Sequence, residues 1–256
     1  MHKLFSNKTV VISGGLGDIG RAIAKEFARG GANIALCDMR EKEEAHAFLE
    51  ELRREYPVEC HYAQVDVSNA DAVEEWLDEM EIKWGVATII VANAATVTLA
   101  GILEMTSQQW TRELRVNLDG AFHLTQLAAR KLVEKKLPGH IVFVGSWAAH
   151  AVHANLPAYC VAKAGMRMLC KCLALELAPH QVLVNEIAPG YVDAGLSGKI
   201  WEHQPDLVRE ATEKVPIKKI MSSASVAWEV AHLCHPNNEH ITGSTLLMDG
   251  GLSLRS

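Results

Sequence analysis

Short runs of apolar, mostly β-branched residues alternate along this chain with longer segments whose apolar residues recur every three to four positions. The first pattern is typical of buried strands, and the second of helices that cover a sheet. It predicts strands over 9–12, 33–37, 60–67, 88–91, 140–144, 182–187 and 245–248. It predicts helices over 19–29, 41–56, 70–83, 107–136, 157–178 and 224–234.

Strands that alternate with helices indicate an α/β fold, a Rossmann-type doubly wound parallel sheet of about seven strands with helices on both faces. No linker, repeat or low-complexity segment divides the sequence, so we expect a single domain over residues 1–256. The stretch 193–216 is polar and interrupted by glycine and proline, which is typical of a mobile substrate lid.

Composition excludes several function classes. The net charge is −6, so no basic surface favours nucleic acid or an anionic membrane. No apolar run has the length of a membrane span, and the N-terminus lacks a signal-peptide core. The six cysteines form no C-x-x-C pair and the 12 histidines no H-x-x-x-H pair, so we expect reduced thiols in the cytoplasm and no metal site.

The first strand runs into the Gly-rich stretch Ser13–Gly20, directly before a helix. Glycines at this place let backbone N–H groups approach a pyrophosphate at the helix N-terminus, although such a stretch can also be only a tight turn. Asp38 ends the second strand, 18 residues after Gly20, where a carboxylate can bind the adenosine ribose hydroxyls. It would repel a 2′-phosphate, and Arg40 is the one nearby cation, so we expect NAD rather than NADP as cofactor.

A second signal is the pair Tyr159 and Lys163, four residues apart near the start of a predicted helix. Residues at i and i+4 share one helix face, so the ammonium is expected to lower the pKa of the phenol. A phenol that titrates nearer neutrality can exchange a proton with an alcohol or a carbonyl. Taken alone, the pair could also share a face by chance.

Together these residues resemble the short-chain dehydrogenase/reductase family in its single-domain form, over essentially the whole chain. The matching motifs are the Gly-rich stretch, Asp66 in Val-Asp-Val, Asn93-Ala94-Ala95, Asn117 in Val-Asn-Leu, Ser146 placed 13 residues before Tyr159, Pro189-Gly190, Ile241-Thr242-Gly243 and Met248-Asp249-Gly250-Gly251.

The resemblance implies an oxidoreductase that transfers a hydride between nicotinamide and a secondary alcohol or ketone. It makes Tyr159 the general acid/base, assisted by Lys163, which also holds the nicotinamide ribose. Ser146 would stabilise the substrate oxygen, and Asn117 would interrupt its helix and hold a water of the proton relay. The implied cofactor-binding residues are Gly14, Leu16, Gly17, Asp18, Ile19, Asp38, Asp66, Val67, Asn93, Ala94, Tyr159, Lys163, Pro189, Gly190 and Val192.

The chain departs from the family pattern at four positions, which are Asp18 and Ala95 where the family has glycine, Ala92 where it has asparagine, and Ala194 where it often has threonine. Asp18 would share the helix N-terminus with the cofactor's pyrophosphate. We expect either that its charge weakens cofactor binding or that it points away and caps the helix.

The substrate is expected to lie against the segment before Tyr159, against Tyr191 and against the lid around 196–203. The lining residues would be Trp147, Ala148, His150, His153, Asn155 and Tyr191. His150, His153 and Asn155 make this wall polar, which favours a sugar or polyol substrate, unless both histidines are surface residues. The alternatives are a reductase of 3-oxoacyl thioesters and, in a different class, a nonenzymatic dinucleotide-binding regulator. The apolar helices near 114–132 and 166–177, which the family commonly pairs between subunits, predict a homotetramer.

Overall fold

The computed structural model describes residues 4–195 and 205–254. Its centre is one parallel sheet in the order β3-β2-β1-β4-β5-β6-β7. The strands are β1 (Thr9–Ser13), β2 (Asn33–Asp38), β3 (Cys60–Gln64), β4 (Ile89–Ala92), β5 (Gly139–Val144), β6 (Val182–Pro189) and β7 (Thr245–Met248). The predicted Rossmann-type sheet is therefore confirmed.

The central strands carry apolar side chains on both faces because successive residues of a strand point to opposite sides. Val10 and Ile12 belong to the core on one face, whereas Val11 between them belongs to the core on the other. Helices cover each face, which explains why the strand sequences are continuously apolar rather than alternating.

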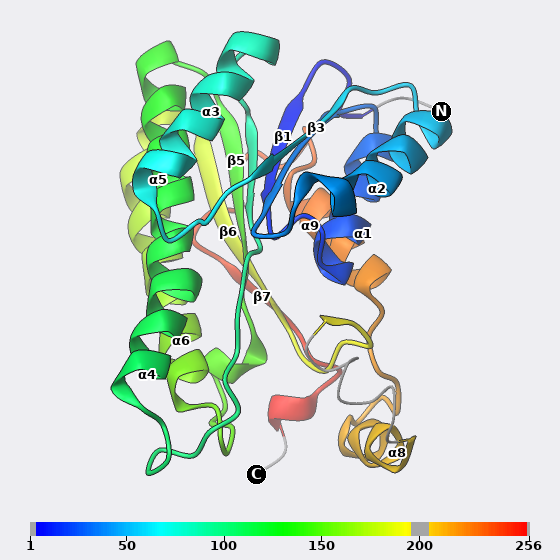
Figure 1. Cartoon of the computed structure of the whole chain (residues 1–256), viewed down its shortest axis with the longest axis vertical. Coiled ribbons are helices and arrows are strands. Elements are labelled where there is room, and N and C mark those ends of the chain that lie inside the picture. The colour runs from blue at the N-terminus through cyan, green and yellow to red at the C-terminus, as the bar shows by residue number, and fades with distance from the viewer. Residues whose placement is uncertain (1–3, 196–204, 255–256) are drawn as a thin grey trace.

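Figure 1 shows these layers with the sheet between two groups of helices. One group holds α1 (Asp18–Arg29), α2 (Lys42–Glu55) and α9 (Ser223–Leu233), and the other holds α3 (Ala70–Trp84), α5 (Gly120–Lys135) and α6 (Pro157–Leu177). Short 3-10 turns lie at η2 (Trp147–Ala149), η3 (Ala178–His180) and η4 (Leu252–Leu254).

The predicted helix over 107–136 is three elements in the structure. It consists of α4 (Ser107–Leu114), the π-helical turn η1 (Arg115–Asp119) and α5. A capping box between Thr106 and Gln109 fixes the start of α4. The π-helical turn contains Asn117, so the expected interruption of the helix at this residue is confirmed.

Two further boundaries differ from the prediction. β3 ends at Gln64 rather than at residue 67, because the Asp66 carboxylate accepts from the Ser68 N–H and turns the chain. In the expected irregular lid over 193–216, residues 205–214 form the helix α8 (Pro205–Lys214), whose Ala211 is buried together with Val215 four residues later. Residues 196–204 of the expected lid lie outside the described residues.

The described residues lack two kinds of feature, a membrane-spanning helix and a metal-binding cluster. Within 4–195 and 205–254, no helix combines the length and the apolar character needed to cross a membrane. The same residues contain no group of three or more His, Cys, Asp or Glu side chains placed to hold a metal ion.

Candidate active site

A cavity of about 1010 Å³ lies at the carboxyl ends of the strands. It opens where β1 has β2 on one side and β4 on the other, so the chain leaves the sheet in opposite directions from neighbouring strands. In doubly wound folds this switch point is where ligands bind. Residues from the Gly-rich turn line one end of the cavity, and Ser146, Tyr159 and Lys163 line the other.

The Gly-rich turn approaches the chain after β4 so closely that side chains are excluded. A Cβ on Gly14 would lie 2.8 Å from the Ala94 Cα, and one on Gly20 would lie 2.2 Å from the Gly14 oxygen. Gly17 is the N-cap of α1 and has no side chain to occupy the helix N-terminus. The helix N-terminus is therefore not blocked by a capping side chain of Gly17, and the pyrophosphate site there stays a prediction.

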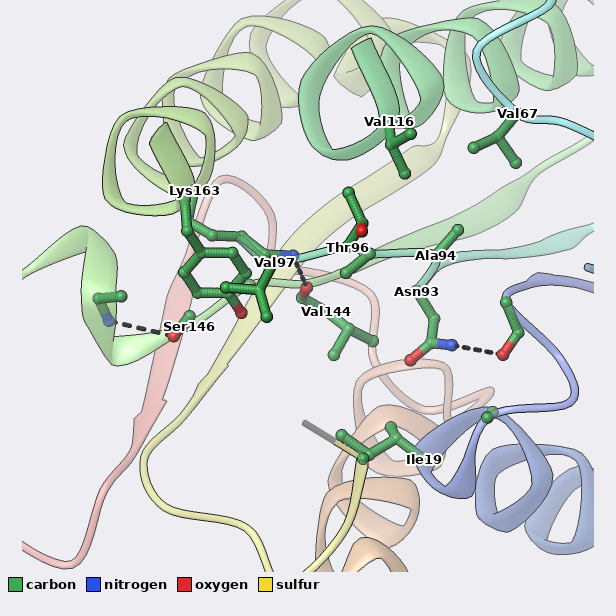
Figure 2. A pocket seen from close by; sticks show the side chains of 18 of the residues that line it. Ile19, Val67, Asn93, Ala94, Thr96, Val97, Val116, Val144, Ser146 and Lys163 are labelled. Carbon is green, nitrogen blue, oxygen red and sulfur yellow. Dashed lines mark hydrogen bonds between the residues drawn. The ribbon is translucent and has the colours of Figure 1, made fainter. Parts of the chain in front are cut away.

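Side chains lock the turn to β4. The Asn93 amide donates to the Ser13 oxygen (2.9 Å) and to the Gly14 oxygen (3.0 Å), as Figure 2 shows for this residue. The Ser13 hydroxyl oxygen accepts from the N–H groups of Asn93 and Ala94, both at 3.1 Å. Ala92 and Ala95, which stand where the family has asparagine and glycine, flank Asn93 and Ala94. The hydrogen bonds of Asn93 and Ala94 with the Gly-rich turn are formed with both alanines present.

Asp38 lies at the end of β2 and lines the cavity. Its Oδ2 accepts from the Leu16 N–H at 3.1 Å, and its Oδ1 accepts from the Arg40 N–H at 3.3 Å. The Arg40 guanidinium also lines the cavity, donates to the Leu16 oxygen at 3.1 Å and lies 3.9 Å from Asp38 Oδ1. Leu16 itself is buried and acts through its backbone groups only.

Asp18 is expected either to weaken cofactor binding by its charge or to cap the helix α1, and the structure shows a different contact. The side chain is exposed and lines the cavity beside the pyrophosphate position, but its Oδ2 accepts from the Gly195 N–H at 2.6 Å. Asp18 therefore connects the start of α1 to the chain after β6, and the expected helix cap is not what the structure shows.

The remaining predicted cofactor residues all lie on the cavity wall. The cavity is lined by Ile19, Asp66, Val67, Pro189, Gly190 and Val192. Gly190 is required by a close approach, since a Cβ there would lie 2.8 Å from the Asp249 Cα. Val192 forms an isolated bridge with Met221, which holds the end of β6 against the chain before α9.

Tyr159 and Lys163 come from the first turns of α6 and share one face, as the spacing predicts. The Lys163 Nζ lies 5.6 Å from the centroid of the Tyr159 ring and donates to the Val144 oxygen at 2.9 Å (Figure 2). Ser146 follows β5, and its Oγ accepts from the Ala148 N–H at 3.1 Å. Because this oxygen accepts from Ala148, the hydroxyl hydrogen of Ser146 can be donated to the Tyr159 phenol or to a substrate oxygen.

The expected direction of the Tyr159 pKa shift is wrong for this geometry. Burial raises the pKa of Tyr159 to about 12, while a hydrogen bond with the Ser146 side chain opposes the rise. Burial also lowers the pKa of Lys163 to about 8, with Glu186 opposing, so desolvation dominates at both groups. The phenol is protonated at neutral pH and is suited to give a proton to a carbonyl oxygen.

Asn117 is fully buried and does not line the cavity. Its Oδ1 accepts from the Thr96 N–H and its Nδ2 donates to the Thr96 oxygen, both at 2.8 Å. Its amide thus holds the loop after β4 in place.

Sequence reasoning missed an ion pair behind Ser146. The Arg167 Nε lies 2.8 Å from Glu186 Oε2, and Arg167 Nη2 donates to the Ser146 oxygen at 3.3 Å. Thr245 Oγ1 donates to the same Glu186 oxygen at 2.6 Å, and the Glu186 side chain has no exposed surface. The pair fixes the backbone of Ser146, but its members lie on different elements and share no motif.

The substrate wall is more aromatic than predicted. Trp147 lies edge-on to His153, with 4.1 Å between ring centroids, and to Tyr191, with 5.5 Å. These three rings and Ala148 line the cavity, whereas His150 and Asn155 are exposed and do not. Asn155 has a left-handed backbone with a φ of 63°, between His153 and Leu156, which both line the cavity. The predicted polar wall is therefore wrong for two of its three members.

Comparisons with known proteins show the family of this chain. A family model described as Enoyl-(Acyl carrier protein) reductase matches residues 15–253. The 3-oxoacyl-[acyl-carrier-protein] reductase FabG of Aquifex aeolicus is 29% identical over 252 residues, 98% of this chain and 100% of that protein.

Solved structures share the fold. A short-chain type dehydrogenase/reductase from Mycobacterium marinum has a TM-score of 0.90 at 28% identity, covering 98% of this chain and 97% of its own. A protein from Agrobacterium tumefaciens that was solved with bound NADP has a TM-score of 0.88 and covers 99% of both chains. Its 24% identity makes this second likeness one of fold alone.

Proposed function

The chain belongs to the short-chain dehydrogenase/reductase family, and from this membership we propose that it reduces the carbonyl group of a 3-oxoacyl thioester with a nicotinamide dinucleotide. Members of the family are oxidoreductases that act on CH–OH or carbonyl groups, so a nonenzymatic regulator is not supported. The observation that carries the proposal is the Tyr159 phenol beside Ser146 and Lys163 at one end of the cavity, which all three residues line.

The chemistry follows from the positions of two hydroxyl groups. The Ser146 hydroxyl, whose oxygen already accepts from Ala148, donates to the substrate carbonyl oxygen and stabilises the charge that develops there. Tyr159 gives its proton to the same oxygen, and its raised pKa keeps the phenol protonated at neutral pH until that transfer. Lys163 holds the β5 end through Val144 and places its ammonium beside the phenol.

The dinucleotide, when bound, supplies the hydride. The residues that would hold it are those of the Gly-rich turn for the pyrophosphate, Asp38 for the adenosine ribose, Asp66 and Val67 for the adenine, and Lys163 for the nicotinamide ribose. The chain from Pro189 to Val192 would hold the nicotinamide end. The absence of any Cβ at Gly14 and Gly17 is what makes the first of these positions fit.

We propose NAD as the preferred dinucleotide. The Asp38 carboxylate lies in the cavity and offers its oxygens to ribose hydroxyls, whereas a 2′-phosphate there would meet a like charge. Arg40 could attract that phosphate, but its guanidinium already contacts Asp38 and the Leu16 oxygen. NADP binding would require Arg40 to leave these partners.

The aromatic wall and the relatives favour the thioester over a sugar or polyol. Val97, Leu99 and Leu156 add aliphatic surface to the cavity beside the Trp147 cluster. Hydrocarbon next to the reacting carbonyl fits this surface. The full-length similarity to FabG of Aquifex aeolicus points to the same substrate class.

We also propose a homotetramer in the cytoplasm. Phe122 on α5 and Val161, Met168 and Leu175 on α6 are exposed apolar residues on the two helices predicted to pair between subunits. All six cysteines are free thiols, which fits a reducing compartment. Light scattering at micromolar concentration should give four times the mass of one chain, and a monomer mass would refute the assembly.

A substrate test in both directions decides the proposed function. The purified protein is given an S-acetoacetyl thioester with NADH or NADPH, and separately a set of sugars and polyols with the oxidised dinucleotides, while nicotinamide absorbance is followed. We expect reduction of the thioester that is lost in Tyr159→Phe. Oxidation of a sugar or polyol at a higher kcat/KM than thioester reduction would refute the substrate class.

A further inference from the structure

Glu113 on α4 is a buried acid that the proposed reaction does not use. Its exposed fraction is 0%, and it lies one helical turn before Asn117. Its Oε1 accepts from the Thr98 N–H, and its buried Oε2 has no hydrogen-bond partner among the described residues. A buried polar atom without a partner costs free energy, so its presence calls for an explanation.

The contacts of Glu113 repeat those of Asn117 one turn earlier on the helix. Asn117 binds both backbone groups of Thr96, and Glu113 binds the backbone N–H of Thr98. Two side chains on successive turns therefore hold two alternate residues of the loop that connects β4 to α4. The loop is fixed along the helix at both points.

The residues between and beyond these two points face the cavity. Val97 and Leu99 line it, and Thr98 does not. Figure 2 shows Val97 at the end of the cavity where Ser146 and Lys163 lie. A shift of the loop at Thr98 would therefore move the aliphatic surface that lies against the reacting end of a substrate.

We propose that Glu113 is a positioning residue that sets the substrate wall by holding Thr98, so that Val97 and Leu99 present their side chains to the acyl part of the substrate. This rests on the proposed function for the identity of the substrate, but the contact with Thr98 does not. Among the described residues, the hydrogen bonds of Glu113 go to the loop and not to the dinucleotide-binding turn or Tyr159, although its charge would raise the pKa of Tyr159.

Energetics favour a positioning role over a packing role. An aliphatic side chain would fill the same buried position without the desolvation of a carboxyl group and without an unpartnered oxygen. Burial raises the pKa of Glu113, opposed by its hydrogen bonds with Thr98, so the group is held toward its neutral form. A neutral carboxyl still accepts from the Thr98 N–H, which is the contact the proposal needs.

The test compares Glu113→Leu with Glu113→Gln, which keeps an oxygen for the Thr98 N–H. Amide exchange is measured by NMR at Thr98 and, as a reference in the same loop, at Thr96, whose partner Asn117 is unchanged. In Glu113→Leu we expect exchange at Thr98 to accelerate by about threefold to tenfold, as for the loss of one hydrogen bond, with Thr96 unchanged. In Glu113→Gln both amides should keep their wild-type protection.

Kinetics give the second readout. In Glu113→Leu the KM for the acyl thioester should rise by about threefold to tenfold with kcat within about twofold of wild type, and in Glu113→Gln both should be restored. Combining Glu113→Leu with Val97→Ala should raise KM by less than the product of the two single effects, because both act on one surface. Cofactor affinity, measured by calorimetry, should be unchanged throughout.

Thr98→Pro removes the N–H donor while leaving Glu113 in place, so the KM measurement can be repeated in this variant if Glu113→Leu does not fold. Unchanged exchange at Thr98 in the leucine variant, or faster exchange there with an unchanged KM, would overturn the proposal. If the wild-type protein does not reduce acyl thioesters, the proposed function fails, and the exchange experiment still tests the contact of Glu113 with Thr98 independently.

Discussion

The two ends of the cavity are held in different ways. At the Gly-rich turn the shape is set by backbone that approaches backbone, with Gly14 and Gly20 in places that admit no side chain. At the other end the shape is set by side chains from distant elements, with Asn117 and Glu113 holding a loop and Arg167 holding Ser146. We therefore expect the first end to tolerate changes of charge, and the second to depend on individual polar groups, most of all on Tyr159 and Arg167.

Among the variants, Tyr159→Phe should lower activity most, and it tests the contrast between the two ends of the cavity most directly. It removes the proton donor and keeps the ring, so kcat should fall by about 10²–10⁴-fold while dinucleotide affinity is retained. Steady-state kinetics and calorimetry measure the two quantities. Tyr191→Phe, in the same cavity, is the matched control and should lose far less activity. Near-wild-type turnover in Tyr159→Phe would mean that another group supplies the proton.

Arg167→Met should be the most damaging change for stability. It leaves the fully buried Glu186 without its cation, which typically costs about 3–5 kcal/mol of unfolding free energy. Denaturant unfolding measures the loss. The double variant Arg167→Met with Glu186→Leu should recover much of the stability without recovering kcat, because the Ser146 oxygen still lacks its donor. Equal recovery of stability and activity would show that the pair has no part in placing Ser146.

Asp38→Ala tests the opposite end, where we expect the reaction to survive. NAD should be preferred over NADP by at least about tenfold in kcat/KM, a difference of only about 1.4 kcal/mol. The variant should narrow this ratio by weakening NAD binding and relieving repulsion of NADP. Wild-type efficiency with NADP that equals or exceeds that with NAD would instead identify Arg40 as the phosphate ligand.

Asp18→Asn should have the smallest effect. It removes a charge beside the expected pyrophosphate but keeps an acceptor for the Gly195 N–H, so dinucleotide binding should tighten by no more than about fivefold, or 1 kcal/mol. Asp18→Gly removes both the charge and the acceptor. The difference in dinucleotide affinity between Asp18→Gly and Asp18→Asn gives the contribution of the hydrogen bond with Gly195. Weaker binding of NADH in Asp18→Asn, measured by calorimetry, would refute charge repulsion at this end.

The same difference between the ends explains what could be predicted from the sequence. The strands, the Gly-rich turn and the Tyr159–Lys163 face depend on residues that are close in the chain, so local patterns were sufficient. The direction of the Tyr159 pKa shift depends on burial, which spacing does not report.

Long-range features at the substrate end had no local signal. Arg167 and Glu186 lie 19 residues apart and meet only because β5 and β6 pair beside α6. Asn155 does not line the cavity, and its left-handed backbone is one that its residue type permits but does not require. Glu113 resembles any acidic residue of a surface helix until the loop after β4 is placed against it.

The order of the strands also has a consequence for biosynthesis. β1 leaves the ribosome first, yet it lies inside the sheet and needs β4 as a neighbour, and the hydrogen bond between Ser13 Oγ and the Ala94 N–H joins residues 81 positions apart. The turn that is fitted to a pyrophosphate is thus completed only after the chain past Ala94 has emerged. A nascent chain that ends before β4 should have no high-affinity dinucleotide site. Added NADH can then assist folding of this protein only in the later part of its synthesis.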